Sequence, residues 1–167
     1  MSEGIRLAAN ADGVRRAFDK LDRPGMLSEL RKATKDTVND LELMQAAVRA
    51  KDFRIPLEDL GKYLQFARLK AQQTGQSVDY LTDSIITGLG RKSLLILDNL
   101  GLSAAEVNEE MAKTGDLMAA VAAIVDRQLA QAGENYVSAA DKAAQKAAEL
   151  QNRQMEIGRL LLPLQEK

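Results

Sequence analysis

Apolar residues recur every three or four positions along most of this 167-residue chain. That spacing places them on one face of an α-helix. The clearest case is residues 57–74, whose apolar stripe consists of Leu57, Leu60, Leu64, Ala67 and Ala71. No convincing run shows the strict alternation typical of half-buried strands. The pattern therefore predicts an all-α protein.

Capping residues and glycines divide the pattern into successive helices, because serine favours helix starts and glycine favours helix ends. Ser77 is expected to begin a helix that Gly88 or Gly90 ends by adopting a positive φ. Further helices are predicted over residues 94–100, 104–113 and 116–132. The residues of the helix after Ser77 that are expected to face the core are Tyr80, Leu81, Ile85 and Ile86.

The segment 138–164 differs from the rest in carrying a heptad pattern over nearly four heptads. Alanines in its first half allow close helix approach, and larger residues in its second half give bulk. One interpretation is an amphipathic helix lying on the domain, and the other is a coiled-coil arm that self-associates. The helix–helix interface predicted on this segment consists of Ala140, Ala143, Ala147, Leu150, Ile157, Leu161 and Leu164.

These patterns predict an irregular multi-helix bundle of about seven or eight helices, with a long, coiled-coil-like helix at the C-terminal end. The expected organisation is a bundle domain over residues 1–133 and a separate heptad helix over residues 134–167. Aromatic residues make up only 4% of the chain. The core must therefore be built from aliphatic residues, methionine and alanine, which favours helix–helix packing.

Composition removes most catalytic and metal chemistry. The chain contains neither cysteine nor histidine, so it lacks thiolate nucleophiles, the commonest general base and the usual transition-metal ligands. We expect no enzyme activity, no cofactor and no metal. The net charge of -1 shows no basic excess of the kind that nucleic-acid binders carry. No apolar run, including residues 94–97, approaches the ~18 residues that a membrane span needs.

Two local patterns suggest chemistry but favour a structural interpretation. The segment 87–93 contains Gly90, Arg91, Lys92 and Ser93, but Arg91 interrupts the Gly-Lys-Ser order of a phosphate-binding loop, and the preceding segment is a predicted helix rather than a strand. Acidic residues also occur close together, and paired acids can hydrolyse glycosides or bind divalent cations. We interpret these acids as solvated helix faces; they are Asp79, Asp83, Glu106, Glu109 and Glu110.

The segment 71–93, with "GLGRKS" at residues 88–93, and "LDNLG" at residues 97–101 resemble a stretch of bacteriophage tail tape measure proteins. The likeness is to the type carried by phages and prophages of gut Bacteroides-like bacteria, and it spans roughly residues 30–164. Leu94 departs from the pattern, since relatives are expected to have proline there. The residues that carry this family motif are Gly88, Gly90, Arg91, Ser93, Asp98, Asn99 and Gly101.

The resemblance implies that the chain is a globular helical segment of a protein that fixes tail length and is ejected ahead of the DNA. It also implies other tail proteins as partners, namely the tail tube and assembly chaperones, or a further copy of the chain. The implied locations are the host cytoplasm during assembly and the virion tail. Two alternatives remain: a helical interaction module of prophage origin, and a helical peptidoglycan-cleaving domain.

Overall fold

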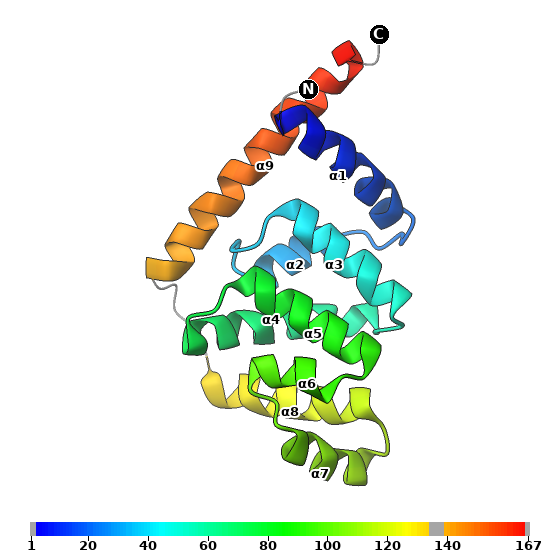
Figure 1. Cartoon of the computed structure of the whole chain (residues 1–167), viewed down its shortest axis with the longest axis vertical. Helices are drawn as coiled ribbons and strands as arrows, with labels where there is room; N and C mark the ends of the chain where they lie inside the picture. The colour runs from blue at the N-terminus through cyan, green and yellow to red at the C-terminus, as the bar shows by residue number, and fades with distance from the viewer. Residues whose placement is uncertain (1–2, 134–138, 166–167) are drawn as a thin grey trace. The chain divides into compact units, whose positions relative to one another are not determined.

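A computed structural model describes residues 3–133 and 139–165, with the side chains of residues 11–133 and 141–160. Every element in these ranges is helical (Figure 1), which confirms the all-α prediction. One or two more α-helices occur there than expected. The elements are α1 (Glu3–Asp19), α2 (Met26–Ala33), α3 (Asp40–Asp52), α4 (Leu57–Thr74), α5 (Val78–Arg91), α6 (Leu94–Leu97), the 3-10 helix η1 (Asp98–Leu100), α7 (Ala104–Thr114), α8 (Leu117–Ala132) and α9 (Ala139–Gln165).

The helices form two compact units whose boundaries differ from the expected ones. The first unit comprises Met1–Val48 and Ser138–Lys167, and the second comprises Arg49–Val137. The boundary expected after residue 133 does fall near a unit boundary. Residues 1–133, however, do not form one bundle. Residues 1–48 belong to the first unit together with α9, which packs with α1, and residues 49–133 belong to the second unit. The sequence does not reveal this, since the partners of α9 lie more than 100 residues away along the chain.

In the second unit, α4 packs against both α5 and α8. The stripe predicted on α4 is buried at Leu60, Leu64, Ala67 and Ala71. Most of α5 is also buried, but Tyr80 is 46% exposed, and its expected inward position is wrong. Tyr80 lies in the first turn of α5, where exposed Asp79 precedes it, and it points about 100° away from buried Leu81.

In the first unit, apolar residues of α2 and α3 form one part of the core, with Leu30, Leu43 and Ala47 fully buried. Ala148 and Met155 of α9 are buried as well. Figure 1 shows α9 as the long orange helix and α1 in blue, and these two helices contact each other. Among the helices of the described ranges, none is long and apolar enough to cross a membrane.

A partly buried ion pair joins α7 to α8 in the second unit. Arg127 of α8 donates a hydrogen bond to Glu110 of α7, whose side chain is 10% exposed. This hydrogen bond holds the pKa of Glu110 below its ordinary value of 4.5. A carboxyl group with a lowered pKa stabilises the fold above that ordinary value, and the contribution is lost as the pH falls through the folded-state pKa.

We therefore expect Glu110→Gln to lower the melting temperature at about pH 6, with the difference from the parent chain shrinking towards about pH 3. Thermal unfolding followed by circular dichroism over this range would measure the effect. The exposed neighbour Glu109 offers a matched control. Glu109→Gln should show no comparable pH-dependent difference, and equal behaviour of the two variants would contradict the assignment.

Candidate functional site

The segment that carries the family resemblance forms the junction of α5, α6 and η1. Gly88 and Gly90 both lie inside α5, which continues to Arg91 and is capped by Lys92 in the left-handed region at φ 54. The prediction that Gly88 or Gly90 adopts a positive φ is therefore wrong. The helical backbone also excludes the phosphate-binding loop that the spacing had already disfavoured.

The two glycines are instead required by close packing. A Cβ at Gly88 would lie 2.7 Å from Cδ2 of Leu97, which is fully buried. A Cβ at Gly90 would overlap the ring of Phe53. Packed interiors do not accommodate such overlaps without displacement. Glycine thus lets α6 and the residue after α3 approach α5.

Two of the remaining motif residues cap helices. Ser93 caps α6, since its Oγ accepts a hydrogen bond of 3.2 Å from the Ile96 amide. Gly101 ends η1 with φ 74. Asn99 lies 3.5 Å from Ser84 Oγ through its Nδ2. Arg91 and Asp98 are both exposed.

The five acidic residues singled out in the sequence do not form one site, although Glu106 and Glu110 both pair with Arg127. Asp79 and Asp83 are exposed on α5, and Asp83 forms an ion pair with Arg49. Glu109 is exposed, in agreement with a solvated helix face, whereas Glu110 is buried in its pair with Arg127. Within the described part of the chain, no group of three or more acidic residues is placed to hold a metal ion.

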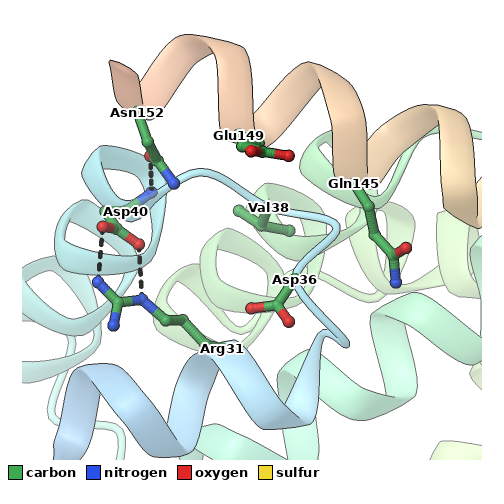
Figure 2. Close-up of a pocket in the computed structure, with 7 residues that line it drawn as sticks. All are labelled: Arg31, Asp36, Val38, Asp40, Gln145, Glu149 and Asn152. Atoms are coloured by element: carbon green, nitrogen blue, oxygen red, sulfur yellow. Dashed lines mark hydrogen bonds and ion pairs between the residues drawn. The ribbon is translucent and has the colours of Figure 1, made fainter.

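The first unit contains a polar pocket of about 380 Å³ beneath α9 (Figure 2). Arg31 of α2 makes two hydrogen bonds to the Asp40 carboxylate, at 2.9 and 2.7 Å. These bonds to Asp40 raise the pKa of Arg31. The full lining is Arg31, Asp36, Val38, Asp40, Gln145, Glu149 and Asn152.

Amide side chains attach α9 to the loop between α2 and α3. Gln145 donates to the Lys35 carbonyl at 2.7 Å, and Asn152 Oδ1 accepts from the Asp40 amide at 2.9 Å. Asn39 donates to Gln151 at 2.7 Å and caps α3 by accepting from the Glu42 amide at 2.9 Å. The pocket is therefore the space left beneath a hydrogen-bonded helix.

Two carboxylates of this pocket have an arginine partner. Asp40 is held by Arg31, and Glu149 forms a 2.6 Å ion pair with Arg153. Glycoside hydrolysis usually pairs one carboxylic acid in an apolar environment with a second acid. Asp40 and Glu149 each lie beside an arginine instead. The pocket therefore presents mainly polar and charged groups.

The predicted interface of α9 faces away from its own unit. Leu150 is 57% exposed and Ile157 is 59% exposed, and Ala143 and Ala147 are also exposed. The side chains of Ala140, Leu161 and Leu164 lie outside the described residues. The helix instead packs through another seven-residue repeat, which consists of Asp141, Ala148 and Met155.

Sequence reasoning missed this inner face, although a signal for it exists. Gln145 and Asn152 are seven residues apart, as are Ala148 and Met155, so each pair lies on one side of the helix. The predicted helix–helix interface followed the larger apolar residues, which lie on the exposed face of α9. Phe53, the partner of Gly90, was also missed because nothing local links two residues so far apart in the chain.

Comparison of the chain with protein-family models, with curated proteins and with solved structures gives no match in any of the three.

Proposed function

We propose that the chain is a structural component of a bacteriophage tail and resembles a globular helical part of a tape measure protein. The observation that supports this is the segment 88–101, whose residues resemble that family and serve packing or capping rather than chemistry. Gly88 and Gly90 allow close helix contacts, Ser93 caps the start of α6, and Gly101 ends η1. In this role the chain would act through packed helices, without catalysis or cofactor.

In this role the chain would work in the bacterial host during tail assembly and remain in the virion tail. Its partners would be the tail tube, assembly chaperones or further copies of itself. The exposed Leu150, Ile157 and Leu160 of α9 provide an apolar surface for such contacts. The same surface favours the second candidate, a helical interaction module of prophage origin that never enters the particle.

The proposal is tested by inducing a prophage that carries the gene and purifying its tails. Mass spectrometry should detect peptides of this chain together with the tail tube protein. In-frame deletion of the region should prevent tail formation or change tail length. Normal tails that lack these peptides would contradict the proposal, and binding to another protein outside the particle would support the interaction module.

The peptidoglycan-cleaving alternative has its own test. Purified chain is incubated with peptidoglycan, and soluble fragments are measured beside Glu149→Gln, which changes an acid lining the pocket. We expect no release above background for either protein. Release that depends on Glu149 would establish catalysis and overturn the structural proposal.

A further inference from the structure

The outward face of α9 carries bulkier apolar residues than the face that packs inside the unit. Leu150, Ile157 and Leu160 are 57, 59 and 69% exposed. The inner face buries Ala148, Met155 and Gly158, supplemented by amide hydrogen bonds. An amphipathic helix ordinarily buries its larger apolar side. The described side chains of the outward face, however, have no apolar cover within their own unit.

The residues of this face change in size along the helix. Ala143 and Ala147 occupy its first half, and Ile157 and Leu160 occupy its second half. When two such helices lie antiparallel, each small residue meets a large one, and the seam can fill at the density of a protein interior. When they lie parallel, alanine meets alanine, and large residues meet large ones.

We propose that the outward face of α9 binds the same face of a second copy of this chain, with the two helices antiparallel. In the matching register Ala147 lies opposite Ile157 of the second copy, and Leu150 lies opposite Gln154. The polar Gln154 then packs at the edge of a leucine, where a single polar residue fixes register at some cost in affinity. This inference does not rest on the proposed function.

The charged residues agree with the antiparallel direction. The same register brings Lys146 towards Glu156 of the second copy and Arg153 towards Glu149 of the second copy. The register also brings the two Arg153 side chains near each other across the two-fold axis, and Glu149, which pairs with Arg153 at 2.6 Å within one chain, offsets their repulsion. A parallel arrangement would instead place the Lys146 side chain near Gln151, which carries no charge. Exposed ion pairs add little affinity, but they select orientation.

One helix seam is smaller than the ~1,600 Å² of a standard stable interface. We therefore expect reversible association that depends on concentration. Sedimentation velocity over a concentration series should show a monomer–dimer equilibrium, which Leu150→Asp abolishes. The matched control is Leu95→Asp, because Leu95 is 83% exposed in the other unit. It should leave the association unchanged.

Orientation can be tested directly because the chain contains no cysteine. Ala147→Cys and Ile157→Cys variants carrying tags of different size are mixed and mildly oxidised. The mixed disulfide should form roughly ten-fold or more faster than the disulfide between either variant and Leu95→Cys, owing to the raised effective concentration. Circular dichroism confirms that each variant is folded.

Three outcomes would overturn the proposal. A chain that stays monomeric at every concentration has no such interface. A dimer that persists in Leu150→Asp uses another surface. Faster formation of the two same-position disulfides than of the mixed one would establish a parallel pair.

Discussion

Gly90→Ala is expected to destabilise the second unit by about 1–3 kcal/mol. In an ordinary exposed helix the same change stabilises, since alanine is better than glycine by about 1 kcal/mol. At position 90 the new Cβ would overlap the ring of Phe53, so the ring or the helix must move. The steric cost should exceed the gain in helix propensity. Urea unfolding followed by circular dichroism would measure it.

Two comparisons isolate that steric cause. Gly13 also lies within a helix, but a Cβ there would meet no atom within 4 Å. Gly13→Ala should therefore stabilise its unit by about 0.5–1 kcal/mol. In a Phe53→Ala background, Gly90→Ala should become neutral or stabilising, because the overlapping ring is gone. Destabilisation that persists in that background would show that the contact with Phe53 is not the cause.

The glycines show which structural roles can be predicted from the sequence and which cannot. A glycine at a helix end and a glycine at a helix crossing look the same in one sequence. Gly75 and Gly115 follow amphipathic stretches and do end helices, with φ near 80°. Gly88 and Gly90 follow an equally amphipathic stretch, but their neighbours Leu97 and Phe53 require the absence of a side chain. Only the tertiary contact distinguishes the two uses.

Helix α4 was predictable because its apolar spacing and its terminal glycine are both local features of the sequence. Its apolar stripe faces α5 and α8, its end is set by Gly75, and its observed bounds match the predicted residues 57–74. The next helix was predicted correctly at its start for the same reason, since Ser77 accepts from the Tyr80 amide at 3.1 Å. Its end was not, because Lys92, rather than a glycine, takes the left-handed conformation.

Helix α9 was predictable as a helix but not in its orientation. Two seven-residue repeats coexist in it, one of larger apolar residues and one of small and polar residues. The choice between them depends on the loop after α2, whose Lys35 carbonyl and Asp40 amide are bonded by Gln145 and Asn152. Those backbone groups are presented only once the loop has folded, so the sequence pattern alone could not decide which face of α9 packs within the unit.

The orientation of α9 leads to the second large expected effect. Met155→Asp should destabilise the first unit by roughly 3–5 kcal/mol, because it removes a buried side chain and places a carboxylate where Met155 is 3% exposed. Leu150→Asp introduces the same charge on the same helix, but at a position that is 57% exposed. At concentrations low enough to keep the chain monomeric, Leu150→Asp should change the free energy of unfolding by no more than about 0.5 kcal/mol.

Hydrogen exchange would locate the effect as well as measure it. In Met155→Asp the amides of α9 should exchange faster than in the parent chain, because the helix loses its apolar anchor beside Ala148. In Leu150→Asp those amides should keep their protection, since the inner face and its bonds to Lys35 and Asp40 are unchanged. The opposite order, with Leu150→Asp the more damaging variant, would mean that the heptad stripe is the face that packs in the monomer. The antiparallel pairing of two copies would then lose its surface, because the same residues cannot serve both contacts.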